Sequence, residues 1–232
     1  MAPGATETVK PVGTAKSPFT TEGVRDYERR RYRGLDQRLV QARESRIVRK
    51  YFKAMGRRAD GGANAAGGLV LDLPCGYGRF SPLLIKSGGR LINSDLSFEM
   101  VRRAEEKSLR PGVAADAKNG LPFRAGAFGA IFSMRFFHHI HDPAERLAVL
   151  AEFARISSGW AVVSYYRSNA LHKAQRALRR LRKKSPRRIR MIEGRTFRVE
   201  AEEAGFEIVR DTPLFRGLHA ARIALLKKAA AR

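Results

Sequence analysis

Residues 69–80 constrain the fold of this chain more than any other stretch, because an apolar run ends in Asp72 and a glycine-rich turn follows at once. The run has the length of a buried parallel strand, and residues 79–86 have the pattern of the helix that follows it. Gly76 and Gly78 allow the backbone of the turn to approach a ligand closely. This order of elements is typical of a loop that holds a nucleotide-type cofactor, although it also occurs at strand–helix junctions without a ligand.

The spacing within the turn narrows the class of cofactor. A dinucleotide-binding turn needs a third glycine three residues after Gly78, where this chain has Ser81, so NAD is disfavoured. The spacing Asp72-x-Pro74-x-Gly76-x-Gly78 resembles motif I of the class I S-adenosylmethionine-dependent methyltransferases, type 11-like, with Pro74 in place of the first glycine. The resemblance implies that Asp72 accepts from the ammonium group of the cofactor, directly or through water, while N–H groups of the turn hold its carboxylate.

A second acid, Asp95, follows the predicted strand 90–93 and lies 17 residues after Gly78. A carboxylate at this strand end can accept hydrogen bonds from both hydroxyls of a ribose, and charged acceptors form the stronger bonds. Asp95 can instead cap the helix that begins near Ser97, and the two roles are compatible.

A third acid, Asp116, follows the short predicted strand 112–115. In the family that the chain resembles, such a carboxylate binds the exocyclic amine of adenine, and the backbone N–H of Ala117 donates to the ring. Met100 is suited to cover a purine face, although a methionine at such a position is more often a core residue. The resemblance implies the following cofactor-binding set: Asp72, Pro74, Cys75, Gly76, Gly78, Asp95, Leu96, Met100, Asp116, Ala117, Met134 and Arg135.

The segment after the predicted fourth strand, residues 128–134, carries paired histidines that also resemble the family pattern. His138 or His139 is the candidate general base, which is needed only when the acceptor carries a proton of high pKa; packing in the cofactor pocket is the alternative role. We expect no metal site, because adjacent histidines should point in different directions and no distant cluster completes a ligand set. The Asn-Pro-Pro-Tyr sequence typical of amino-group methylation is not present at residues 134–137, which disfavours that chemistry.

Alternating strand and helix patterns predict an α/β fold with a doubly wound, mostly parallel sheet. Asp142 and Pro143 open a helix to about Ile156, strands are predicted at 160–164, 206–209 and 221–226, and a helix at 195–204. The family resemblance implies seven strands with the last one antiparallel. We expect a disordered tail at 1–20, a basic helical region at 21–58, and a methyltransferase domain at 65–232 with a basic helical insertion at 168–195.

The net charge of +24 is concentrated in two regions. Residues 25–58 contain 13 Lys or Arg against four acids, and residues 167–198 contain another 13 against Glu193 alone. Such fields attract anionic partners. The second region has an apolar stripe flanked by cations, and it can be a lid on its own domain, an arm for RNA phosphates or a helix on an anionic membrane.

The single cysteine, Cys75, excludes an internal disulfide, is compatible with a reducing cytosol, and is expected to be a small packing residue. No run is long and apolar enough for a transmembrane segment, so we expect a cytoplasmic protein, peripheral at the membrane if the insertion binds lipid. The sequence thus predicts S-adenosylmethionine-dependent methyl transfer to an anionic or amphiphilic small molecule near a membrane surface. The alternatives are an RNA methyltransferase and a noncatalytic RNA-binding or assembly factor that keeps the fold.

Overall fold

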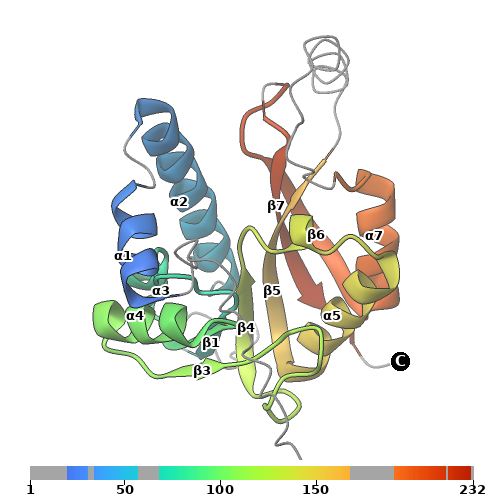
Figure 1. The fold of residues 1–232 in the computed structure, drawn as a ribbon. Helices are drawn as coiled ribbons and strands as arrows, with labels where there is room; N and C mark the ends of the chain where they lie inside the picture. Colours follow the sequence, from blue (N-terminus) through green and yellow to red (C-terminus); the bar gives the residue numbers. More distant parts are fainter. Residues whose placement is uncertain (1–19, 31–33, 57–67, 168–190, 218, 231–232) are drawn as a thin grey trace, which may run out of the picture.

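The protein is a seven-stranded sheet with helices on both faces (Figure 1). The computed structural model describes residues 20–30, 34–56, 68–167, 191–217 and 219–230. The strand order is β3-β2-β1-β4-β5-β7-β6. The strands are β1 (Leu69–Asp72), β2 (Arg90–Asp95), β3 (Gly112–Ala114), β4 (Phe128–Ser133), β5 (Ser157–Tyr166), β6 (Phe206–Pro213) and β7 (Ala221–Lys228).

Strands β1 to β5 pair in parallel, whereas β7 runs antiparallel to both of its neighbours, β5 and β6. The doubly wound, mostly parallel sheet with an antiparallel last strand is therefore confirmed. Its central strands are covered on both faces, which is why their sequences are almost continuously apolar instead of alternating. The carboxyl ends of β1, β2 and β4 meet at one edge, and the acids predicted at strand ends lie there.

Each face of the sheet has its own core. Helices α2 (Leu35–Met55) and α3 (Ser81–Lys86) cover one face, where Ile47, Val48 and Phe52 of α2 belong to the same buried cluster as Val70 and Phe132 of the sheet. The other face is covered by α5 (Pro143–Ile156) and α7 (Gly194–Glu203). The basic region at 21–58 therefore contributes α2 to the core on the first of these faces.

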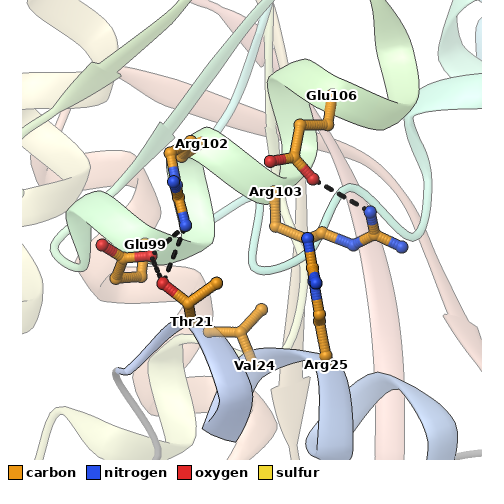
Figure 2. A pocket seen from close by; sticks show the side chains of 7 residues that line it. All are labelled: Thr21, Val24, Arg25, Glu99, Arg102, Arg103 and Glu106. Carbon is orange, nitrogen blue, oxygen red and sulfur yellow. Dashed lines mark hydrogen bonds and ion pairs between the residues drawn. The ribbon is translucent and has the colours of Figure 1, made fainter.

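Helix α1 (Thr21–Arg30) packs on α4 (Phe98–Ser108) through polar and ionic contacts (Figure 2). Thr21 Oγ1 donates to Glu99 Oε2 at 2.7 Å, and Arg102 Nη2 lies 2.9 Å from the same oxygen. Arg103 bridges Glu28 of α1 and Glu106 of α4. The cavity among these side chains has a volume of about 10 Å³, so it has room for about one water and none for a nucleoside.

Several expected boundaries shift slightly. Helix α3 begins at Ser81 and not at residue 79, because Gly78 has a φ of +73° and Phe80 occupies the cap position. Strand β2 extends to Asp95, because Asp95 still pairs with Ala114 of β3. The start of α5 is confirmed: Asp142 is its N-cap and accepts from the Ala144 amide. The expected tail and most of the basic insertion at 168–195 lie outside the described residues.

Candidate functional site

The turn after β1 is hydrogen-bonded to the tip of β2. The Cys75 amide donates to the Ser94 carbonyl at 2.7 Å, and the Gly76 amide donates to Asp95 Oδ2 at 2.9 Å. A Cβ on Gly78 would lie 3.0 Å from the Ala104 Cα of α4, whereas a Cβ on Gly76 would meet no atom within 4 Å. Gly78 is therefore required for packing of α4, and Gly76 is the glycine that faces open space.

Asp95 is held by two backbone donors. Its Oδ2 accepts from Gly76, and its Oδ1 accepts from the Ser97 amide at 3.0 Å. Each carboxylate oxygen keeps capacity for a further hydrogen bond. Burial raises the pKa of Asp95, and the backbone donors oppose that shift. The alternative that Asp95 is the cap of α4 is wrong in detail, because Ser97 is the N-cap and its hydroxyl accepts from the Met100 amide.

Asp72, at the end of β1, is 2% exposed, and its Oδ2 has no hydrogen-bond partner among the described residues. Burial raises its pKa well above the ordinary value; the Arg79 guanidinium opposes the shift and Asp95 adds to it. A buried carboxylate without a partner is unfavourable, so this oxygen is suited to a cationic or hydrogen-bonding ligand group. This acceptor fits the ammonium end of S-adenosylmethionine, which donates hydrogen bonds.

The remaining expected contacts divide into turn residues and packing residues. Asp116 Oδ1 accepts from the Lys118 amide and its Oδ2 from Asn119 Nδ2, so this half-buried acid organises the turn after β3. Ala117 is buried in the α5-side core. Met100 forms a buried cluster with Val24 and Tyr77, which favours the packing role that the sequence left open.

Three further residues of the expected set differ in their surroundings. Leu96 is 69% exposed at the beginning of the turn into α4. Cys75 is buried beside Val101 and Ala104, and burial raises the pKa of its thiol well above the ordinary value, as suits a packing residue and not a nucleophile. Met134 is buried in the α2-side core.

An ion-pair cluster that sequence reasoning missed joins α2 to the site. Glu44 of α2 is 3% exposed; its Oε2 accepts from Arg79 Nη1 at 2.7 Å and its Oε1 from Arg135 Nη2 at 2.8 Å. Arg79 belongs to the turn after β1, and Arg135 follows β4 with a φ of +61°, a conformation that costs a non-glycine residue about 1–3 kcal/mol. The available signal was the position of Glu44, three and four residues before the buried Ile47 and Val48 on one helix face.

The paired histidines lie in η1 (Phe137–His139), just after β4. The rings of His138 and His139 are 3.9 Å apart, and the His138 ring lies 4.9 Å from that of Tyr166 at the end of β5. The expectation that adjacent histidines point in different directions is wrong, because the tight turn of η1 places both rings side by side. Burial and the nearby His141 lower the pKa of His139, which favours its neutral, proton-accepting form. Within the described ranges, no group of three or more His, Cys, Asp or Glu is arranged to hold a metal ion.

The geometry has counterparts in known proteins. Residues 39–211 match a family profile described as a methyltransferase domain. The chain belongs to this family. The predicted family, the class I S-adenosylmethionine-dependent methyltransferases, and the predicted fold are thereby confirmed.

Two curated proteins and one solved structure illustrate the similarity. A tRNA (carboxymethyluridine(34)-5-O)-methyltransferase of Xenopus tropicalis is 33% identical over 111 residues, which are 44% of this chain and 17% of that protein. A ubiquinone biosynthesis O-methyltransferase of Ralstonia nicotianae is 33% identical over 98 residues, 40% of this chain and 41% of that protein. The chain thus spans less than half the length of these curated relatives.

The crystal structure of magnesium protoporphyrin IX methyltransferase from Synechocystis PCC 6803 with bound SAH has the same fold. It superposes with a TM-score of 0.73 at 20% identity and covers 91% of this chain and 97% of that one. In the described part of the chain, no helix has the length and apolar content needed to cross a membrane.

Proposed function

We propose that the protein transfers the methyl group of S-adenosylmethionine to an oxygen atom of an anionic or amphiphilic small molecule. The observation that carries the proposal is the buried Asp72 carboxylate, whose Oδ2 has no partner among the described residues, beside Asp95 and the open face of Gly76. A carboxylate in this setting is unfavourable without a cation, and the proposed cofactor carries an ammonium group. When bound, the cofactor supplies an electrophilic methyl group on a sulfonium.

The chain's own residues would bind and orient this cofactor. Asp72 would accept from the ammonium group, and Asp95, already fixed by two backbone donors, would accept from the ribose hydroxyls. Asp116 and the N–H of Ala117 would contact the adenine. Fixing the cofactor in this way contributes to rate mainly by holding the reacting groups in line.

The acceptor would bind beyond the tips of β4 and β5, where η1 and Tyr166 lie. His139 is the better candidate for a proton acceptor, because its lowered pKa keeps it neutral near pH 7. Its base function is needed only for an un-ionised hydroxyl; an acceptor that is already a carboxylate or phenolate needs binding alone. Methylation of oxygen is supported by the two curated relatives, whose names both specify an O-methyltransferase.

The cofactor part of the proposal is tested by calorimetry with S-adenosylmethionine and S-adenosylhomocysteine on the purified full chain. We expect binding to the wild type, and loss of binding for Asp95→Ala. Glu207→Ala removes an exposed acid from β6 and serves as the charge-matched control, so it should bind as the wild type does. Absence of binding to the wild type, or unchanged binding after Asp95→Ala, would refute the proposed site and favour a noncatalytic role.

The acceptor part is tested by comparing metabolites and lipids of a deletion strain and the wild type for pairs that differ by one methylene unit. A pair that depends on the intact gene, and on His139 if the acceptor is a hydroxyl, supports small-molecule methylation. An RNA acceptor is the second candidate, favoured by the tRNA-modifying relative from Xenopus tropicalis and by the net charge of +24. Crosslinking in cells that recovers transfer or ribosomal RNA above background, with no altered metabolite, would favour RNA.

A further inference from the structure

Helix α2 presents one face to the core and the opposite face to solvent. Its buried side includes Ile47, Val48 and Tyr51, which pack on the sheet. At 100° per residue, most of the exposed residues fall on the other side of the helix, whereas the exposed Asp36 and Gln37 of the first turn lie outside this face. We call this set the outer face of α2; it consists of Leu35, Arg38, Leu39, Ala42, Arg46, Arg49, Lys50 and Lys53.

The outer face of α2 carries five cations and no acid. None of the five forms an ion pair with a described residue, whereas Arg102, Arg103 and Lys107 of α4 are all paired. Two helices on the same side of the sheet thus differ: the positive charge of α4 is neutralised internally, and that of α2 is not. An uncompensated positive stripe is complementary to an anionic surface outside the protein.

The first two turns of the outer face of α2 carry two exposed leucines beside Arg38. Leu35 is 79% exposed and Leu39, one turn later, is 66% exposed. Exposed leucines in line with cations on one helix face are typical of a helix that lies in a lipid headgroup layer. Recognition of RNA single strands uses aromatic side chains between the cations, and the outer face of α2 has none.

The position of α2 connects this surface to the site. Glu44, on the inner side of the helix, binds both Arg79 and Arg135, and Arg43 Nε donates to the Leu214 carbonyl in the β6–β7 connection at 3.0 Å. In Figure 1 the first turns of α2 point to the same side of the molecule as the end of β5, where the proposed acceptor site begins. A surface that binds the outer face of α2 would therefore lie on the same side of the molecule as the proposed acceptor site.

We infer that the outer face of α2 docks the protein on an anionic lipid surface, with Leu35 and Leu39 in the headgroup layer and the five cations facing lipid phosphates. Docking itself does not depend on the proposed function. Its consequence does: if the protein is a methyltransferase of the proposed kind, its acceptor is an amphiphile that is taken from the membrane.

The inference is tested by co-sedimentation of the full chain with phosphatidylcholine vesicles that contain or lack phosphatidylglycerol. We expect the wild type to pellet with the anionic vesicles only, and less as salt is raised. Each cation near the surface contributes about fivefold to partitioning, so the triple variant Arg38→Gln, Arg46→Gln, Arg49→Gln should partition about a hundredfold less. Leu35→Ser with Leu39→Ser should also reduce binding, with the charge unchanged.

The control removes the same charge elsewhere. Arg110, Arg124 and Lys227 are exposed cations outside α2, and changing all three to Gln should leave partitioning within about threefold of the wild type. Circular dichroism should show that every variant is folded. Calorimetry with S-adenosylhomocysteine should be unchanged, so a failure of docking can be told apart from a failure of the proposed cofactor site.

Five results would overturn the inference. The first three are equal pelleting with neutral vesicles, equal loss of binding in the variant with Arg110, Arg124 and Lys227 changed to Gln, and wild-type binding by the α2 triple variant. In the last case, loss of binding after neutralising Arg176, Arg179, Arg180 and Lys183 would assign the contact to the insertion. The fourth is RNA binding, without vesicle binding, that requires the α2 cations and not the leucines. The fifth is a concentration-dependent dimer that the leucine variant abolishes, which would identify a second copy of the chain as the occupant of the outer face of α2.

Discussion

Replacement of Glu44 should destabilise the protein far more than its place in a basic helix suggests. The side chain is 3% exposed and receives two guanidinium groups, at 2.7 Å from Arg79 and 2.8 Å from Arg135. Glu44→Ala leaves Arg79, whose side chain is 11% exposed, without this counter-ion. Removing one partner of a buried ion pair costs about 3–5 kcal/mol.

The exposure of the partners sets the size of the effect. The Arg135 side chain is 24% exposed, so water replaces part of its lost contact, and we expect the lower limit, about 3 kcal/mol. For a chain of this length, 1 kcal/mol corresponds to about 2–4 °C in Tm, so Glu44→Ala should lower Tm by about 6–12 °C. Urea unfolding followed by circular dichroism measures the free energy directly.

An exposed ion pair provides the matched control. Glu202 of α7 lies 3.9 Å from Arg198, with both side chains more than half exposed. Glu202→Ala should therefore change the free energy of unfolding by less than about 0.5 kcal/mol. A loss of under about 1 kcal/mol for Glu44→Ala, or losses of equal size for both variants, would show that the Glu44 cluster contributes little and would refute this account.

Three further predictions concern the cofactor site. Gly78→Ala should destabilise the protein by more than the cost of about 1–2 kcal/mol for a left-handed residue, because its Cβ would also press on α4; Gly76→Ala should show only that cost and a weaker affinity for S-adenosylhomocysteine. The pKa of Asp72 is 3.8 in the unfolded chain and is raised well above this value by burial in the folded, ligand-free protein. Between these two pKa values only the folded protein keeps the proton on Asp72. The free energy of unfolding should therefore fall as the pH rises from 3.8 to the raised pKa. Because the ligand's ammonium favours the ionised carboxylate, the increase in Tm caused by S-adenosylhomocysteine should be larger at about pH 8 than at about pH 5, and a pH-independent increase would contradict this. Arg79→Gln should move the midpoint of pH-dependent S-adenosylhomocysteine binding to higher pH, since Arg79 lowers the pKa of Asp72. Arg135→Gln, which removes the other partner of Glu44, should leave this midpoint unchanged. Calorimetry between about pH 5 and about pH 8 distinguishes the two variants.

The predicted elements with strong local signals are confirmed by the structure. The apolar run before Asp72 is β1, and the Asp142-Pro143 pair opens α5. Both depend on residues close together in the chain, so their pattern is visible in the sequence. The assignment of Asp72 and Asp95 to the cofactor remains a prediction, supported by their burial beside the open face of Gly76.

Other features could not be read from the sequence, because they depend on distant contacts. Nothing local indicates whether Met100 covers a ligand or packs under α1; the docking of Val24 and Tyr77 decides this. The side-by-side rings of His138 and His139 follow from the short 3₁₀ helix after β4, whereas a regular element was expected to point adjacent histidines in different directions.

The sequence by itself determined the order of strands and helices and the positions of three acids at strand ends, because periodicity and motif spacing are local properties of the chain. Only the tertiary structure decided that Glu44 joins two arginines located 35 and 91 residues away, and that the opposite side of the same helix is left basic and exposed. The net charge follows from counting residues in the sequence. Whether a given charge is paired depends on its distance from an opposite charge, and these distances are fixed only when the helices pack on the sheet.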